Sequence, residues 1–159
     1  MHTAFVLTIS DGVSAGTRDD ASGNALAARV AALGYQVERG VVPDTRKDIA
    51  ETIRGQTARA RLIVSTGGTG LGPRDVTPEA VRDLVDYEIP GFGELMRAVG
   101  RTHTPMADLS RSLAGVLDAC LIVCVPGSIT GATESFDAIA PLLEHALETL
   151  GGHTQHAGG

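Results

Sequence analysis

Residues 62–79, LIVSTGGTGLGPRDVTPE, decide the fold, because they join a buried strand to a helix through a glycine-rich loop. The run LIV at residues 62–64 is short, branched and apolar, which is typical of a strand buried on both faces of a parallel sheet. Gly67, Gly68 and Gly70 follow it. Glycine tolerates positive φ, and three glycines in four residues leave several backbone N–H groups that can face an anion.

Polar and charged residues surround these glycines. Thr66 and Thr69 add hydroxyl groups, and Arg74 and Asp75 place opposite charges next to each other. TPE at residues 77–79 predicts a helix start, with an N-cap, a proline at the first helical position and an acid in the first turn. A tight turn that only packs a helix on a sheet remains an alternative, because the loop matches neither GxGxxG nor GxxxxGK[ST].

The composition is that of a globular protein. The 159 residues are expected to form one domain at residues 1–150, followed by a flexible glycine-rich tail at residues 151–159. A hydrophobic content of 43% excludes a disordered chain. The net charge of −6, the 3% aromatic content and the absence of Trp disfavour nucleic acid as a partner. An anionic ligand would need local N–H groups, arginines or a divalent cation.

The first residues and the cysteines indicate a cytoplasmic protein without a membrane partner. Residues 1–3 carry no Lys or Arg, and the apolar run at residues 4–9 is too short for a signal segment or a membrane span. Cys120 and Cys124 fall on one expected strand, about 13 Å apart, which is beyond the reach of a disulfide. We interpret them as buried small hydrophobes, with a reactive thiol or a metal ligand as the alternative.

Apolar runs at residues 5–9, 35–42 and 121–125 predict three further strands, which alternate with amphipathic helices. This alternation predicts a three-layer α/β sandwich with a mostly parallel sheet. Two extended runs that meet near residues 117–119 predict a hairpin, which adds a small antiparallel element. Pro141 lies inside the last helical stripe and should kink it or start a new segment.

The loops that follow parallel strands meet at one edge of the sheet and often bind ligands there. The loops expected at this edge are residues 10–20, 43–45, 66–75 and 126–128. From its position alone, Asp44 is either a turn or helix-cap acid or an active-site carboxylate beside the glycine loop. Glycine amides, hydroxyl groups and two carboxylates, without a histidine beside a serine, suit phosphoryl or nucleotidyl transfer better than hydrolysis by a nucleophile.

The string TGGTGLGPRDVTPEA at residues 66–80 resembles the signature of the molybdopterin-binding domain family, and in particular of its molybdopterin adenylyltransferases. The resemblance covers nearly the whole chain. Four more strings carry it, namely VPD at residues 42–44, PGFGELMR at residues 90–97, LSRS at residues 109–112 and PGS at residues 126–128.

The resemblance implies an enzyme of molybdenum cofactor biosynthesis. Such an enzyme transfers AMP from MgATP to the phosphate of molybdopterin and releases pyrophosphate. ATP and molybdopterin are the implied substrates, Mg²⁺ is the implied cofactor, and residues 1–150 are the implied molybdopterin-binding domain. The expected partners, besides these small molecules, are two further copies of the chain in a homotrimer and the molybdenum-insertion protein. The choice between molybdenum and tungsten stays open.

The resemblance also assigns expected roles to residues. Asp44 and Asp75 are the expected catalytic acids and metal ligands. The expected substrate-binding residues are Thr66, Gly67, Gly68, Thr69, Gly70, Arg74 and Ser110, and the expected nucleotide-binding residues are Ser10, Asp11, Gly127 and Ser128. Arg74 either offsets charge or only pairs with a carboxylate. At position 124 the adenylyltransferases often carry Asn, two residues before Pro126, whereas this chain has Cys124. This difference bears on the contacts expected for the second ligand, the nucleotide.

Two other functions remain open. A binding-only paralogue would hold the pterin or serve as a scaffold without transfer, and the intact PRDVTPE string together with Asp44 disfavours it. A relative fused into a nucleotide pyrophosphatase or deamidase would hydrolyse a dinucleotide. The expectation of a single domain disfavours that second function.

Overall fold

One six-stranded mixed sheet, with the spatial order β2-β1-β3-β6-β5-β4, organises the protein. The computed structural model describes residues 2–152. The strands are β1 (Thr3–Ile9), β2 (Gln36–Val42), β3 (Leu62–Thr66), β4 (Tyr87–Glu88), β5 (Leu113–Leu117) and β6 (Cys120–Val125). The helices are α1 (Asp11–Ser14), α2 (Ala21–Ala32), α3 (Arg46–Gln56), α4 (Thr77–Leu84), α5 (Pro90–Arg101), the 3-10 helix η1 (Pro105–Leu109) and α6 (Ile129–Leu150).

The four strands β2, β1, β3 and β6 run parallel, so their carboxyl ends lie at one edge of the sheet. β5 pairs antiparallel with β6, and β4 pairs antiparallel with β5. The predicted α/β class, with a mostly parallel sheet and an antiparallel hairpin, is therefore confirmed. The turn between β5 and β6 places Asp118 and Ala119 at φ values of +51° and +62°, the left-handed conformation that two-residue hairpins favour.

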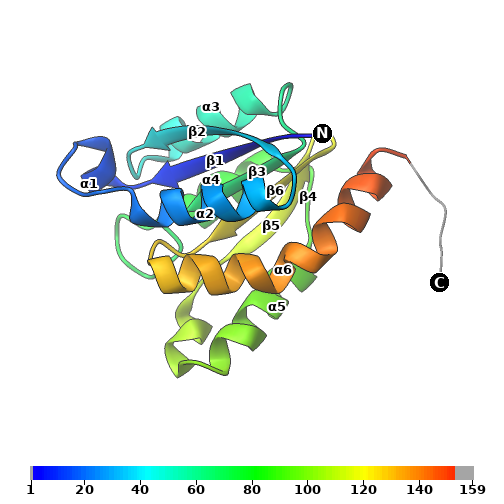
Figure 1. Ribbon diagram of the computed structural model, residues 1–159. Helices are drawn as coiled ribbons and strands as arrows, with labels where there is room; N and C mark the ends of the chain where they lie inside the picture. Colours follow the sequence, from blue (N-terminus) through cyan, green and yellow to red (C-terminus); the bar gives the residue numbers. More distant parts are fainter. Residues whose placement is uncertain (1, 153–159) are drawn as a thin grey trace.

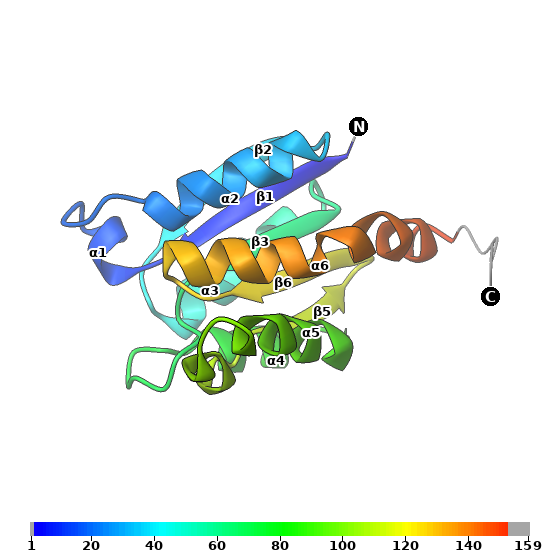
Figure 2. The same ribbon diagram turned by 60° about the horizontal axis from the view of Figure 1, so that its bottom comes forward.

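Helices cover both faces of the sheet and complete three layers, as Figures 1 and 2 show. α2, α5 and α6 pack on one face, against alternate residues of the strands such as Val6 and Val123. α3 and α4 pack on the other face of the sheet, against the intervening strand residues, such as Leu7 and Ile122, whose side chains point to that face. Successive strand side chains point to opposite faces, so the two apolar layers come from the same continuous apolar runs.

Both cysteines lie on β6 and are buried and unpaired, as the sequence predicts. Burial raises the pKa of Cys120 to about 12 and that of Cys124 to about 11. Both thiols are therefore protonated at neutral pH and are poor nucleophiles. None of the helices in residues 2–152 is long and apolar enough to cross a membrane.

Three local features refine the expected fold. The loop expected at residues 10–20 contains the one-turn helix α1, which Ser10 caps by accepting a hydrogen bond from Val13 N at 3.2 Å. The edge strand β4 has two residues, which is too short to leave an alternating pattern. Of the two outcomes expected at Pro141, the structure contains the kink: α6 continues through the proline, and Figure 1 shows the helix changing direction. The tail predicted at residues 151–159 lies outside the described residues beyond Gly152.

Candidate active site

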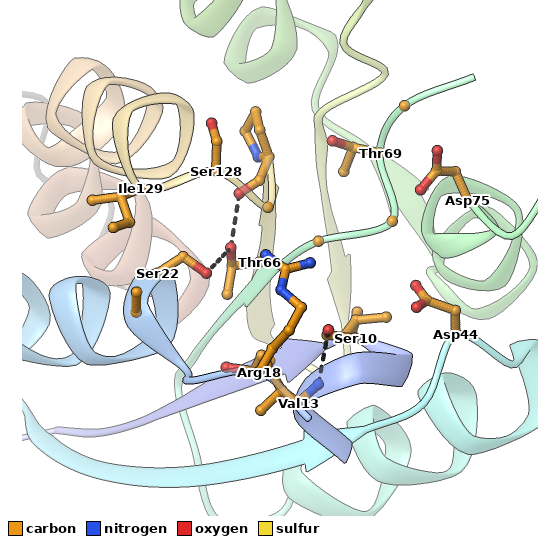
Figure 3. Close-up of a pocket in the computed structure, with 18 of the residues that line it drawn as sticks. Ser10, Val13, Arg18, Ser22, Asp44, Thr66, Thr69, Asp75, Ser128 and Ile129 are labelled. Atoms are coloured by element: carbon orange, nitrogen blue, oxygen red, sulfur yellow. Dashed lines mark hydrogen bonds between the residues drawn. The ribbon is translucent and has the colours of Figure 1, made fainter. Parts of the chain in front are cut away.

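An open pocket of about 760 Å³ lies at the carboxyl-terminal edge of the parallel strands. The loops after β1, β2, β3 and β6 all contribute to its lining, together with η1 and the residue that follows it (Figure 3). The structure brings together in this pocket all predicted site residues except Asp11 and Arg74. Loops that are far apart in the sequence thus form one site.

The glycine loop packs tightly between β1 and α4. Gly67 and Gly68 have φ values of +109° and +70°. A Cβ atom on Gly67 would lie 2.1 Å from the carbonyl oxygen of Ile9, and one on Gly68 would lie 2.3 Å from Thr77 Oγ1. Thr77 is not the predicted N-cap, a position that Val76 holds; its hydroxyl instead donates to Gly67 O at 2.9 Å.

The N–H groups of this loop are not equally available to a ligand. Gly67 N donates to Val125 O at 3.1 Å, so the amide of Gly67 is already occupied, contrary to our expectation. The amides of Gly68, Thr69 and Gly70 donate to no acceptor in residues 2–152. Three successive amides are therefore available to an anion; compared with the predicted glycine amides, that of Gly67 drops out and that of Thr69 is added.

Thr66, a predicted substrate contact, links two loops beneath the pocket. Its hydroxyl donates to Pro126 O at 2.7 Å and lies 3.1 Å from Ser22 Oγ. The side chain is buried. Thr66 therefore fixes the end of β3 against the loop after β6.

Asp44 is a half-buried carboxylate whose pKa lies above its ordinary value. Burial is the largest cause and raises this pKa, and the negative charges of Asp11 and Asp75 raise it further. The hydrogen bond from Asp11 N and the positive charge of Arg74 lower it, but they do not cancel the rise. Asp44 Oδ2 accepts from Asp11 N at 2.9 Å, and Asp11 Oδ1 accepts from Asp44 N at 2.9 Å. These reciprocal bonds fix the loop after β2 against the loop after β1.

Asp75 faces the same part of the pocket as Asp44, from the far end of the glycine loop (Figure 3). Its Oδ2 accepts from Gly72 N at 2.8 Å. Asp44 Oδ1 and Asp75 Oδ1 accept no hydrogen bond from any described residue. Each carboxylate thus keeps one oxygen free.

Arg74 and Asp11 pair with each other and lie outside the pocket lining. Arg74 Nε and Nη2 donate to the two carboxylate oxygens of Asp11, both at 3.0 Å. These bonds hold the pKa of Asp11 below its ordinary value. Of the two roles considered for Arg74, pairing with a carboxylate is the one the structure contains. The carboxylate of Asp11 is likewise engaged by Arg74 and by Asp44 N, and Asp11 does not line the pocket; its contact with the nucleotide stays a prediction.

Arg111 is a residue that the sequence analysis missed. Its Nε donates to Gly70 O at 3.0 Å, its Nη2 to Asp75 O at 2.8 Å and its backbone N to Thr69 O at 2.8 Å, and it also pairs with Glu79. Arg111 therefore holds the glycine loop in place from below. The LSRS string contains this arginine, but its partners Gly70 and Asp75 lie 41 and 36 residues away in the sequence, so no local pattern marks it. Ser110, from the same string, lines the pocket, with its Oγ 2.8 Å from Ser112 Oγ.

The two acids form a donor set that suits Mg²⁺ rather than a metal bound by protein alone. No group of three or more His, Cys, Asp or Glu residues able to hold a metal occurs in residues 2–152. Mg²⁺ usually takes one or two protein carboxylates and completes its shell with water and substrate phosphates. The free oxygens of Asp44 and Asp75, which line the same pocket, fit such a shared ion.

Asp44→Asn is expected to raise the free energy of unfolding at neutral pH. The folded-state pKa of Asp44 is raised above the ordinary value of 3.8, so the folded protein binds this proton more tightly than the unfolded chain. The contribution of Asp44 to stability is therefore lost as the pH rises from about 3.8 through the raised pKa, so the variant should gain stability relative to the wild type over this range. Urea unfolding of both proteins between about pH 3.5 and pH 7.5 measures the difference. A variant that is less stable than the wild type at pH 7 would refute the interpretation.

The fold and the site define an α/β domain with an amide-lined pocket at the carboxyl edge of a mostly parallel sheet. Within that class, the family described as "Probable molybdopterin binding domain" matches residues 5–145. The chain therefore belongs to the molybdopterin-binding domain family.

Named relatives and solved structures agree with this family. A molybdenum cofactor biosynthesis bifunctional protein of Synechococcus elongatus is 39% identical over 154 residues, which cover 94% of this chain and 47% of that protein. The chain thus spans about half the length of this relative. A molybdopterin adenylyltransferase of Helicobacter pylori J99 is 34% identical over 93% of this chain and 87% of its own length. The crystal structure of the molybdopterin biosynthesis enzyme MoaB from Thermus thermophilus superposes with a TM-score of 0.87 at 44% identity, over 96% of this chain and 98% of that one.

Proposed function

We propose that the protein is a molybdopterin adenylyltransferase of molybdenum cofactor biosynthesis. A phosphate oxygen of molybdopterin attacks the α-phosphorus of ATP, the bond from that phosphorus to the bridging oxygen of the β-phosphate breaks, and pyrophosphate leaves. The observation that carries the proposal is the meeting of Asp44 and Asp75 with the free amides of Gly68, Thr69 and Gly70 in one pocket. The similarity to a relative named as this enzyme supports it.

The residues of the pocket divide between two phosphate-bearing substrates. The amides of Gly68, Thr69 and Gly70 hold the phosphate of the pterin, and Ser110 at the neighbouring edge contacts the pterin itself. Ser10, Gly127 and Ser128, which line the pocket from the loops after β1 and β6, contact the nucleotide. Arg111 and the Arg74–Asp11–Asp44 contacts position these groups without touching substrate. The catalytic contribution is mainly alignment of the attacking and leaving oxygens.

Asp44 and Asp75 would hold Mg²⁺ through their free oxygens, together with the triphosphate. An ion held by these two carboxylates would supply positive charge to the phosphate oxygens of the leaving pyrophosphate. Without it, three acidic side chains of the lining, Asp19, Asp44 and Asp75, would repel the triphosphate. Burial is the main cause of the raised pKa of Asp44, and the negative charges of Asp11 and Asp75 add to it.

The direct test is a transfer assay with the purified protein, ATP, MgCl₂ and molybdopterin. We expect formation of adenylylated molybdopterin and release of an equal amount of pyrophosphate, and neither product when the pterin or the metal is omitted. Pterin binding without transfer would instead identify a binding-only paralogue. Hydrolysis of ATP or of a dinucleotide without transfer would identify the hydrolytic alternative.

The proposed localisation, oligomeric state and protein partner rest on the family resemblance. We place the enzyme in the cytoplasm as a homotrimer that passes its product to the molybdenum-insertion protein. Sedimentation equilibrium of the purified protein should give three times the mass of one chain. A mass of 16.4 kDa at micromolar concentration would contradict the trimer.

A further inference from the structure

Arg18 is the cationic side chain of the pocket. In the described part of the chain, the pocket is lined by the acidic residues Asp19, Asp44 and Asp75, and Arg18 is the one basic residue among the lining groups. Other arginines near the pocket are engaged elsewhere: Arg74 pairs with Asp11, Arg39 of β2 with Asp20, and Arg111 with Glu79. The positive charge that can meet a ligand in this pocket therefore comes from Arg18.

No hydrogen bond or ion pair within residues 2–152 engages the guanidinium group of Arg18. The side chain is exposed at the pocket wall, although Asp19 follows it directly in the sequence. Figure 3 shows it extended over the pocket from the loop after β1. A guanidinium group has five N–H donors in a planar fork, a geometry that matches two oxygens of one phosphate.

The structure holds the aliphatic part of Arg18 against helix α1. A Cβ atom on Gly12 would lie 2.8 Å from Cδ and 3.1 Å from Cγ of Arg18, so the side chain crosses α1 where Gly12 leaves room for it. The backbone N of Arg18 donates to Gly12 O at 3.2 Å, and that of Thr17 donates to the same oxygen at 2.9 Å. Gly12 itself does not line the pocket.

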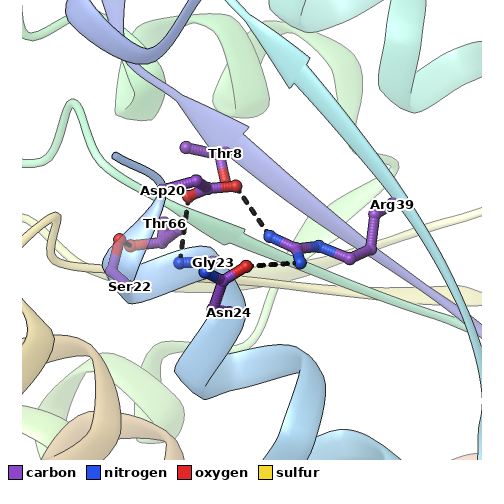
Figure 4. A network of polar contacts seen from close by, with 7 residues as sticks. All are labelled: Thr8, Asp20, Ser22, Gly23, Asn24, Arg39 and Thr66. Carbon is purple, nitrogen blue, oxygen red and sulfur yellow. Dashed lines mark hydrogen bonds and ion pairs between the residues drawn. The ribbon is translucent and has the colours of Figure 1, made fainter. Parts of the chain in front are cut away.

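The other end of this loop is anchored by Asp20, two residues after Arg18 (Figure 4). Asp20 accepts hydrogen bonds from Thr8 Oγ1 at 2.8 Å, from Gly23 N at 3.1 Å and from Arg39 Nη2 at 2.7 Å. These bonds fix the loop to β1, to the first turn of α2 and to β2. Arg18 therefore projects from a loop whose backbone is fixed on both sides.

We propose that Arg18 binds a phosphate group of the ligand and makes the pocket selective for phosphorylated over unphosphorylated molecules. The inference deepens the proposed function and rests on it for the identity of the ligand. The phosphate belongs either to the nucleotide or to the pterin, and both offer the same chemistry to a guanidinium group. Charge-assisted hydrogen bonds to a phosphate are among the stronger contacts a single side chain can make.

Isothermal titration calorimetry of Arg18→Gln tests the proposal. Three ligands are used, namely ATP with MgCl₂, adenosine and molybdopterin, and Arg54→Gln serves as the control because Arg54 is an exposed arginine of α3 outside the pocket. We expect Arg18→Gln to weaken the binding of one phosphorylated ligand by roughly 10- to 100-fold. Adenosine affinity should change by less than about twofold. Arg54→Gln should bind all three ligands as the wild type does.

Gly12→Ala provides a second variant that leaves the pocket lining intact. Its methyl group would displace the side chain of Arg18, and alanine is more favourable than glycine inside a helix, so the fold is retained. We expect the same ligand to lose affinity by about 3- to 10-fold, and this loss to disappear when Gly12→Ala is combined with Arg18→Gln. A loss that persists in the double variant would show that Gly12 does not act through Arg18.

The outcomes separate this inference from the proposed function. A loss confined to ATP identifies the nucleotide phosphate as the partner of Arg18, and a loss confined to molybdopterin identifies the pterin phosphate. Unchanged affinity of Arg18→Gln for both phosphorylated ligands overturns the inference, whether or not the wild type transfers AMP. A wild type that binds both ligands but transfers nothing refutes the proposed function and leaves the phosphate-binding role of Arg18 intact.

Discussion

Asp75→Asn is expected to lower the rate of AMP transfer by roughly 10³-fold, because it removes one of the two charges that hold the cation and the phosphates in line. Asparagine has nearly the same shape as aspartate, and its carbonyl oxygen can still accept the hydrogen bond from Gly72 N. The backbone contact from Arg111 to Asp75 O does not involve the side chain. The free energy of unfolding and the affinity for molybdopterin should therefore change little.

A single-turnover assay, run alongside urea unfolding and pterin titration, separates these effects. Asp83→Asn is the matched control, because Asp83 is an exposed acid on α4 that lies outside the pocket. We expect the control to transfer AMP at the rate of the wild type. Retained turnover in Asp75→Asn would remove the catalytic role from this carboxylate, and an unfolded variant would assign it a structural role instead.

Gly67→Ala is expected to lower the free energy of unfolding by about 2–5 kcal/mol, the largest stability effect we predict for one added methyl group. Two costs combine: a left-handed backbone for an L-residue costs roughly 1–2 kcal/mol, and overpacking costs roughly 1–3 kcal/mol. The position has φ of +109°, and its Cβ atom would lie 2.1 Å from the backbone oxygen of Ile9. A backbone atom in β1 cannot move aside as a side chain can.

Gly16→Ala separates the two costs. Gly16 has φ of +76° in the loop after α1, and a Cβ atom there would have no other atom within 4 Å. Its substitution should cost only about 1–2 kcal/mol, the conformational part. Chemical denaturation of the two variants and the wild type gives both values. Equal losses in the two variants would show that the contact between the glycine loop and β1 is loose.

The fold could be predicted because each element has a local pattern that agrees with the whole. Apolar runs of strand length alternate with helical stripes, and this alternation leads to a parallel sheet with helices on both faces. The hairpin from β5 to β6 follows from two adjacent extended runs. α1 and β4 were missed because their four and two residues are too short to show a period.

The position of the site could also be predicted, because parallel strands bring their following loops to one edge. The sequence could not predict which donor and acceptor atoms of the site are free to contact a ligand. The amide of Gly67 is occupied by Val125 O, a partner on another strand, and Arg74 pairs with Asp11, 63 residues away in the sequence. Such pairings depend on how loops meet in space, and no local pattern encodes them.

The place of Cys124, where the adenylyltransferases often carry Asn, also could not be judged from the sequence. Its position in the sequence suggested an effect on the contacts of the second ligand. In the structure, the side chain is fully buried on β6 and does not line the pocket, whereas Gly127 and Ser128 after it do. The departure therefore lies in the core beneath the site.

The claim that Asp44 and Asp75 share one cation with a bound triphosphate can be measured directly by Mn²⁺ titration, followed by electron paramagnetic resonance in the presence of ATP. The wild type should bind one Mn²⁺ per chain together with ATP, and Asp44→Asn and Asp75→Asn should each weaken that binding by at least about tenfold. Mn²⁺ affinity that stays at the wild-type value in both variants would contradict the account.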